Sequence, residues 1–110
     1  MKFGVCGNPA VASEAARASY VFMEWSVGEV LKPREPKEAF ETVLREIRAC
    51  ALPCQALNSF IPANLKITGP AVDPGALTNF VATACQRAEE AGVTVIVFGS
   101  GGARGIPEGF

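Results

Sequence analysis

The sequence contains no histidine and no excess of positive charge. Because Ser-His-Asp and Cys-His nucleophilic sites use an imidazole as their base, the lack of histidine excludes them within one chain, together with any histidine-ligated metal. Ten Lys and Arg are scattered among eleven Asp and Glu, for a net charge of −1. A nucleic-acid-binding protein presents a basic face to the phosphodiester backbone, so nucleic acid is not expected as a partner.

Long apolar runs are also missing. No stretch approaches the ~18 apolar residues of a membrane span, and the apolar run after Lys2 is too short for a signal peptide. We therefore expect a cytoplasmic protein without a membrane partner. The four cysteines lie in apolar segments instead of a dense secreted framework, which predicts reduced core thiols at Cys6, Cys50, Cys54 and Cys85.

The 110 residues, 49% of them hydrophobic, predict a single domain over 1–110 that alternates strands and helices. Asn8-Pro9 and Asp73-Pro74 are typical of an N-cap followed by a first-turn proline, and Gly92 is typical of the residue after a helix. The predicted strands are 2–6, 20–24, 54–57 and 93–98, and the predicted helices follow Asn8 and cover 37–51 and 74–91.

This β-α-β-α-β-α-β order predicts a parallel sheet with right-handed crossovers, in a doubly wound sheet or in a segment of a barrel. The last strand, Val93-Thr94-Val95-Ile96-Val97-Phe98, is apolar without alternation, which predicts burial on both faces. Ile106-Pro107-Glu108 is typical of the first turn of a helix that does not continue, so we expect the chain to be cut at its fourth helix.

Polar residues follow the predicted second and third strands. Glu24 is placed to face a ligand as an acid, a base or a metal ligand, or to be an ordinary solvated carboxylate. Asn58 and Ser59 are placed to orient a hydroxylated ligand, although both are also common turn residues.

A glycine-rich loop over 99–105 follows the fourth predicted strand. Its backbone N–H groups and Arg104 suit an anion, with Ser100 beside them, whereas the alternative is a plain tight turn. The dinucleotide fingerprint fails because Arg104 stands where a glycine is needed, and the Gly-Lys-Ser/Thr end of a nucleotide phosphate loop is absent.

Three segments together resemble the xylose-isomerase-like sugar phosphate isomerase/epimerase family. They are Tyr20-Val21-Phe22-Met23-Glu24-Trp25-Ser26-Val27-Gly28-Glu29, Leu57-Asn58-Ser59-Phe60-Ile61-Pro62 and Val97-Phe98-Gly99-Ser100-Gly101-Gly102-Ala103-Arg104-Gly105-Ile106-Pro107-Glu108-Gly109-Phe110. The resemblance spans the whole chain in order. It implies a (βα)4 parallel half-barrel, the first half of a TIM (β/α)8 barrel that lacks most of its fourth helix.

The resemblance also implies that the two halves of the barrel have different roles. Family members use a divalent metal, held by residues of strands five to eight, to shift a proton between adjacent carbons of a ketose. This chain would carry no metal or other cofactor and would contribute a wall for a sugar or sugar phosphate, built from Glu24, Asn58, Ser59, Ser100 and Arg104. We expect no catalytic residue and no activity alone, with a missing C-terminal half or a second copy as partner. The alternative is a non-catalytic, self-associating half-barrel that holds a small anion.

Overall fold

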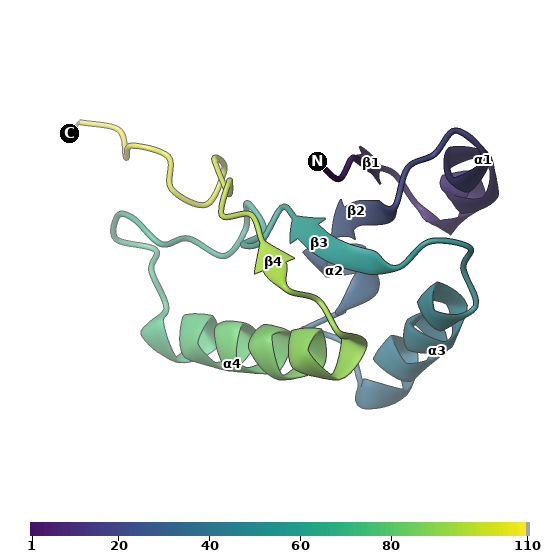
Figure 1. The fold of residues 1–110 in the computed structure, drawn as a ribbon. Coiled ribbons are helices and arrows are strands. Elements are labelled where there is room, and N and C mark those ends of the chain that lie inside the picture. Colours follow the sequence, from purple (N-terminus) through teal and green to yellow (C-terminus); the bar gives the residue numbers. More distant parts are fainter. Residues whose placement is uncertain (110) are drawn as a thin grey trace.

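The computed structural model describes residues 1–109 and has an α/β fold with a four-stranded, all-parallel sheet (Figure 1). The strands lie in the order β1-β2-β3-β4, which is also their order in the chain. The elements are β1 (Gly4–Cys6), a short 3-10 helix η1 (Pro9–Val11), α1 (Ala12–Arg17), β2 (Phe22–Ser26), α2 (Val27–Val30), α3 (Lys37–Arg48), β3 (Cys54–Asn58), α4 (Pro74–Ala91) and β4 (Val95–Ile96). The parallel α/β fold expected from the alternation of elements is confirmed.

Local capping signals fix where the predicted helices begin and end. The Asn8 side chain accepts a hydrogen bond from the Ala10 N–H at 3.0 Å and caps η1, from which the chain continues into α1. Asp73 accepts one from the Ala76 N–H at 3.0 Å and caps α4. Gly92 follows α4 in the left-handed conformation with φ of 74°, a conformation that costs glycine little. These three expectations are confirmed.

One helix was not expected. Helix α2 occupies 27–30, where the sequence predicted a loop, and it begins at Ser26, whose Oγ accepts from the Glu29 N–H at 3.3 Å. The same Oγ donates to the Glu29 carboxylate at 2.7 Å. Strand β2 therefore runs to Ser26, past the predicted end at Glu24. Helix α3 ends at Arg48, before the predicted end at Ala51.

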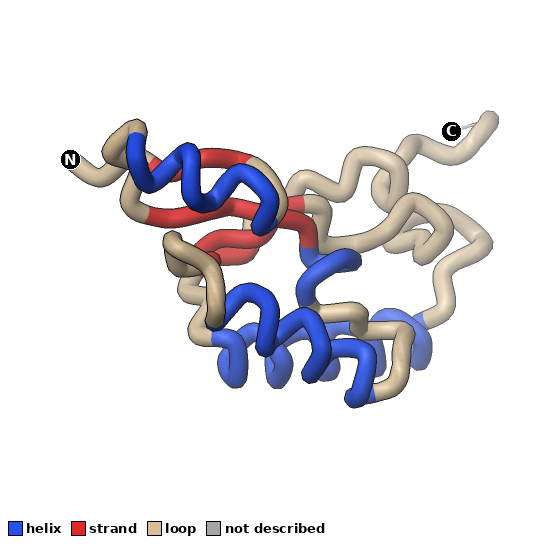
Figure 2. The backbone as a smooth tube through the Cα atoms, turned by 90° about the vertical axis from the view of Figure 1, so that its right-hand side faces the viewer, coloured by secondary structure: helices blue, strands red, loops and turns tan. Residues whose placement is uncertain are grey.

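All four helices pack against one face of the sheet. On that face Val5 and Met23 contact α1, while Trp25, Leu57 and Ile96 pack with the other helices. Figure 2 shows α1 near the N-terminus, apart from the layer formed by the remaining helices. Since side chains alternate along a strand, the intervening residues point to the opposite face. We call this second surface the open face; its residues include Cys6, Phe22, Glu24, Asn58 and Val95, and the alternation continues to Val97 beyond β4.

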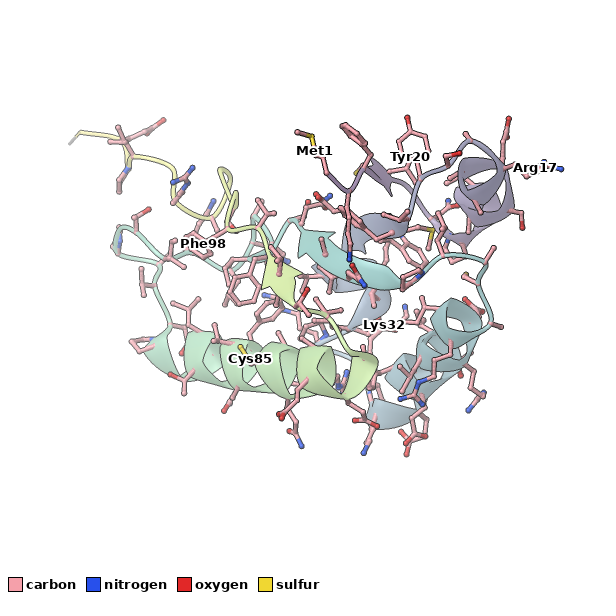
Figure 3. All side chains as sticks on the ribbon, in the orientation of Figure 1. Met1, Arg17, Tyr20, Lys32, Cys85 and Phe98 are labelled. Carbon is pink, nitrogen blue, oxygen red and sulfur yellow. The ribbon has the colours of Figure 1, made fainter. Side chains whose placement is uncertain are left out.

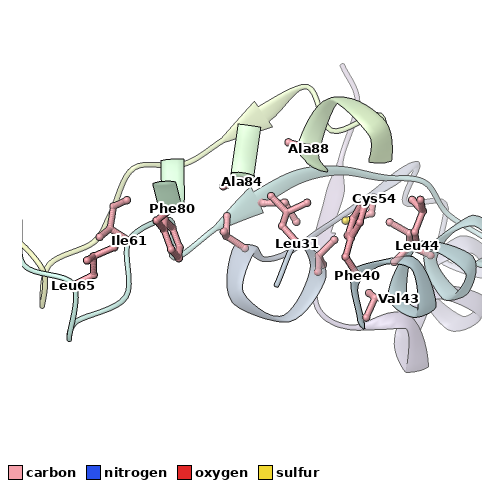
Figure 4. Packing of buried hydrophobic residues seen from close by; sticks show 14 of the residues in the cluster. Leu31, Phe40, Val43, Leu44, Cys54, Ile61, Leu65, Phe80, Ala84 and Ala88 are labelled. Atoms are coloured by element: carbon pink, nitrogen blue, oxygen red, sulfur yellow. The ribbon is translucent and has the colours of Figure 1, made fainter. Parts of the chain in front are cut away.

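The main core lies between β3 and helices α2, α3 and α4. Its largest fully buried side chains include Phe40, Leu31 and Leu57. Figure 4 shows Phe80, Ala84 and Ala88 of α4 on one side of this core. The side chains of Ala84 and Ala88 are small, so α4 can approach the sheet closely.

The fourth strand departs most from expectation. Strand β4 is limited to Val95 and Ile96, although the N–H groups of Thr94 and Val97 also donate to the Gln55 and Leu57 carbonyls of β3. Val95, Val97 and Phe98 are 52%, 44% and 50% exposed. The prediction of a long strand buried on both faces is therefore wrong, because within residues 1–109 no element covers the open face. Figure 3 shows Phe98 at the end of β4, on the stretch that leads to the C-terminus.

Residues 106–109 form no helix, so the predicted first turn of a fourth helix is absent from the described part of the chain, and Phe110 lies outside it. Across residues 1–109, the helices are all too short or too polar to cross a bilayer.

Candidate functional site

The carboxyl ends of β1, β2 and β3 bring four polar side chains together on and beside the open face. The Asn58 Nδ2 donates to the Glu24 Oε1 at 3.0 Å and approaches the Cys6 Sγ at 3.4 Å. The Ser59 Oγ donates to the Asn58 Oδ1 at 3.1 Å. We call Cys6, Glu24, Asn58 and Ser59 the carboxyl-end cluster. Three of the predicted binding residues therefore form one connected unit.

Glu24 does not follow β2 but lies at its centre. It nevertheless reaches the end of the sheet because β1 is short: Glu24 pairs with Cys6, the last residue of that strand. A break in register between Met23 and Glu24 then places Glu24 opposite Ala56, two residues before Asn58. The Glu24 carboxylate is half-buried, and its Oε2 accepts no hydrogen bond from within residues 1–109.

The orientation of the Asn58 amide is fixed on both sides. Its nitrogen faces a carboxylate and a thiol, and its oxygen faces a hydroxyl, so the opposite amide orientation would lose the hydrogen bond to Glu24. Asn58 thereby holds the carboxylate in place and leaves the second carboxylate oxygen for another donor. A fixed carboxylate on a half-open surface can accept hydrogen bonds from hydroxyl groups and disfavours anions.

Ser100 is hydrogen bonded to the loop that follows β3. Its Oγ accepts from the Ile61 N–H at 2.8 Å, and its backbone has a positive φ of 48°. This bond joins the glycine-rich loop to the loop after Ser59. Ser100 therefore supports the loop beside the carboxyl-end cluster, and within residues 1–109 no hydrogen bond links it to the cluster directly.

Arg104 lies apart from the cluster. It lines a surface hollow with Thr68, Gly69, Ile106 and Pro107, and no hydrogen bond between residues of 1–109 joins its guanidinium to Glu24, Asn58 or Ser59. The structure therefore does not join the Arg104 side chain to Glu24, Asn58 or Ser59; within the described residues, only the backbone N–H of Arg104 is bonded to a predicted binding residue, Ser100.

Several polar groups of the glycine-rich loop are already paired. The N–H groups of Ala103 and Arg104 donate to the Ser100 carbonyl at 3.0 and 3.2 Å. The Gly102 carbonyl accepts from the Lys66 Nζ, and the Gly105 carbonyl from the Thr68 Oγ1, both at 2.8 Å. The first two bonds lie within the loop and occupy two of its N–H groups, so fewer N–H groups remain for an anion than the sequence suggested. The other two join the loop to Lys66 and Thr68.

The cysteines separate into two kinds. Cys54 is buried, and desolvation, with a smaller effect of nearby Cys50, raises the pKa of its thiol to about 11. Burial, and then the neighbouring Glu46 carboxylate, also raise the pKa of Cys50. All four cysteines are free, but Cys6 and Cys85 are exposed, so the prediction that all are core thiols is wrong for these two.

Cys6 is the site residue that sequence reasoning missed. Its signal was its place at the end of β1, directly before Gly7, which is the same kind of position that drew attention to Asn58. The described chain contains no group of three or more Cys, Asp or Glu side chains arranged to hold a metal ion.

In a comparison with known proteins, no family model, no curated protein and no solved structure matches the chain.

Proposed function

We propose that the open face binds a small hydroxylated compound of the sugar class at the carboxyl-end cluster, as the substrate-side wall of a sugar isomerase/epimerase-like site that is inactive alone. The observation that carries the proposal is the Asn58 amide, which bonds the Glu24 carboxylate at 3.0 Å on a face that no helix covers within residues 1–109. Ligand sites of parallel α/β proteins lie at this end of the strands.

The polarity of the cluster favours a hydroxylated ligand over an anion. The Glu24 carboxylate offers an acceptor to a sugar hydroxyl, and the Ser59 hydroxyl offers a donor and an acceptor. No arginine or lysine is hydrogen bonded to the cluster among the described residues. A phosphate group of a bound sugar phosphate would therefore extend away from Glu24, toward a cation outside the cluster.

The arrangement of strands supports the finer assignment of the fold to the first half of a (β/α)8 barrel. Strands adjacent in the chain are adjacent in the sheet, and all helices pack on one face. Successive units of a (β/α)8 barrel have this arrangement, whereas a doubly wound sheet carries helices on both faces. In a barrel the open face would be the interior.

The proposed role stops short of proton transfer. A metal-dependent isomerase needs several carboxylate ligands, and the cluster has one carboxylate beside an amide and a thiol. These residues do not fit a divalent metal site, so no step of the reaction is assigned to this chain.

A binding experiment on the full chain tests the proposal. Fructose serves as the probe, and affinity is compared between the wild type, Glu24→Gln and the exposed control Glu14→Gln. Because hydrogen bonds to a charged acceptor are stronger than neutral ones, Glu24→Gln should weaken binding about tenfold, and Glu14→Gln should leave it unchanged. Equal affinity in all three proteins, or no binding to the wild type, would refute the proposal.

A second candidate function is self-association of the half-barrel into a dimer. The exposed apolar side chains of Val95, Val97 and Phe98 at one edge of the sheet favour it. The outer edges of β1 and β4 are unpaired in the described chain, which makes them templates for another strand. A net charge of −1 offers little repulsion between copies.

Light scattering decides this second candidate. A dimer has twice the mass of the 11.5 kDa chain, and Val97→Lys should shift it toward the monomer. Ile106 is also exposed but lies after the glycine-rich loop and not on the sheet. Ile106→Lys is therefore the matched control and should leave the dimer intact. A wild-type chain that stays at 11.5 kDa at micromolar concentration would defeat it.

A further inference from the structure

A separate hollow of about 200 Å³ lies on the helix-covered side of the sheet, beside the segments that follow β2 and β3. Its walls are the segment from Gly28 to Glu35, the segment from Ser59 to Pro62, and Phe80 of α4. It is smaller than the pockets that hold drug-sized ligands, so its occupant would be a compact molecule.

The floor of this hollow is aromatic. The ring centroids of Phe60 and Phe80 lie 6.3 Å apart at an interplanar angle of 49°, and Phe98 packs edge-on against Phe60 at 5.8 Å. Phe80 also belongs to the main core, whose side chains pack against it (Figure 4). Phe80 is only 6% exposed, so Phe60 presents most of the preformed apolar surface to a flat ligand while Phe80 closes the floor beneath it.

The rim of the hollow carries a cation without a carboxylate partner. The Arg34 guanidinium lies 5.8 Å from the centroid of the Phe80 ring, and its Nη1 donates to the neutral Asn64 Oδ1 at 2.8 Å. The ion pairs within residues 1–109 are Lys32 with Glu35 and Lys37 with Glu90, so no carboxylate neutralises Arg34. Lys32 and Glu35 cancel each other at 3.2 Å, which leaves the rim with one positive charge.

Buried contacts hold the loop that carries this cation. Arg87, 9% exposed, donates from α4 to the carbonyls of Leu31, Lys32 and Glu35. Lys32 and Ser59, on opposite walls of the hollow, both have positive φ, 46° and 53°. Such conformations are unfavourable for residues other than glycine and persist where the surrounding structure enforces them.

We propose that this hollow binds a small monocarboxylate with a flat, apolar body, such as an aromatic acid. The rings of Phe60 and Phe80 cover the body, and the Arg34 guanidinium pairs with the carboxylate, since a planar guanidinium matches a carboxylate in geometry. The single net positive charge suits a monoanion better than a dianion. This site shares Ser59 with the carboxyl-end cluster, but Arg34, Phe60 and Phe80 are not part of that cluster.

Titration calorimetry on the full chain, with benzoate, benzamide and acetate as probes, tests the assignment. Benzoate should bind about tenfold more tightly than benzamide, which has the ring without the charge, and than acetate, which has the charge without the ring. In Arg34→Gln the preference for benzoate over benzamide should disappear while benzamide binding persists. The matched control Arg17→Gln removes an exposed arginine of α1 and should keep the preference.

The outcomes separate clearly. An unchanged preference in Arg34→Gln removes Arg34 from the site and overturns the assignment. Equal binding of benzoate and benzamide to the wild type, or no binding of benzoate, overturns it as well. A loss of all binding in Phe60→Leu with preserved thermal stability would support the aromatic floor, and unchanged benzoate affinity in that variant would contradict it.

Discussion

Arg87 is the one buried charged residue within residues 1–109, and we consider its replacement by methionine. The Arg87 Nη1 donates to the Leu31 carbonyl at 2.9 Å and to the Lys32 carbonyl, and its Nη2 donates to the Glu35 carbonyl at 3.0 Å. Its guanidinium also lies 5.4 Å from the centroid of the Phe40 ring. Methionine replaces the aliphatic stem of arginine and makes none of these bonds.

The cost can be worked from the acceptors that are left behind. The Leu31 carbonyl belongs to a residue with no exposed surface, so its lost partner costs about 1–3 kcal/mol. The carbonyls of Lys32 and Glu35 are close to solvent, and water replaces their donor at about 0.5 kcal/mol each. We expect Arg87→Met to lower the free energy of unfolding by about 3 kcal/mol, a large part of the 5–15 kcal/mol of a typical domain.

Urea unfolding followed by far-ultraviolet circular dichroism measures this difference. Arg87→Lys keeps the charge but loses the planar guanidinium whose two nitrogens reach the three carbonyls, so it should retain only part of the stability. Arg45→Met, on the exposed side of α3, is the control and should change stability by less than about 0.5 kcal/mol. If Arg87→Met is as stable as this control, the three carbonyl contacts do not hold the loop after α2 and the reasoning fails.

Three further predictions concern the sheet, the cysteines and a helix cap. A Cβ added at Gly4 would lie 2.2 Å from the Phe22 ring, so Gly4→Ala should lower the free energy of unfolding in urea by about 1–3 kcal/mol. This cost should vanish in a Phe22→Ala background, and an undiminished cost there would show that the clash lies elsewhere. Mass spectrometry after iodoacetamide treatment at pH 8 should find exposed Cys6 alkylated well before Cys54, because a pKa of about 11 leaves about one thiolate per thousand at Cys54; equal rates would contradict its burial. Asp73→Ala should lower the unfolding free energy by about 1 kcal/mol through loss of the N-cap, and a neutral effect would show that α4 does not depend on it.

Signals confined to a few neighbouring residues predicted much of the fold. Asn8, Asp73 and Gly92 mark helix ends by contacts within three or four residues, so the sequence alone was sufficient. Helix α2 had a comparable signal, since Ser26 and Glu29 have the spacing of a capping box, but the prolines that follow suggested a loop.

Long-range contacts could not be predicted in this way. Arg87 is buried within the apolar stripe of α4 because three carbonyls, all more than fifty residues away, accept its protons. Glu24 and Asn58 were each identified from strand ends, but their bond depends on the register shift between β2 and β3. Arg104 seemed equivalent to them by position, yet the bonds between its loop and the segment around Thr68 place it elsewhere.

The most direct test of the central claim is to map fructose binding on the full chain by titration in amide-resolved nuclear magnetic resonance. Binding at the carboxyl-end cluster predicts shift changes concentrated at Cys6, Glu24, Asn58 and Ser59, with α1 and α3 unaffected. Saturable shifts at these residues that need about tenfold more fructose in Glu24→Gln would support the account. Shifts confined to other surfaces, or no saturable shifts at any fructose concentration, would contradict it.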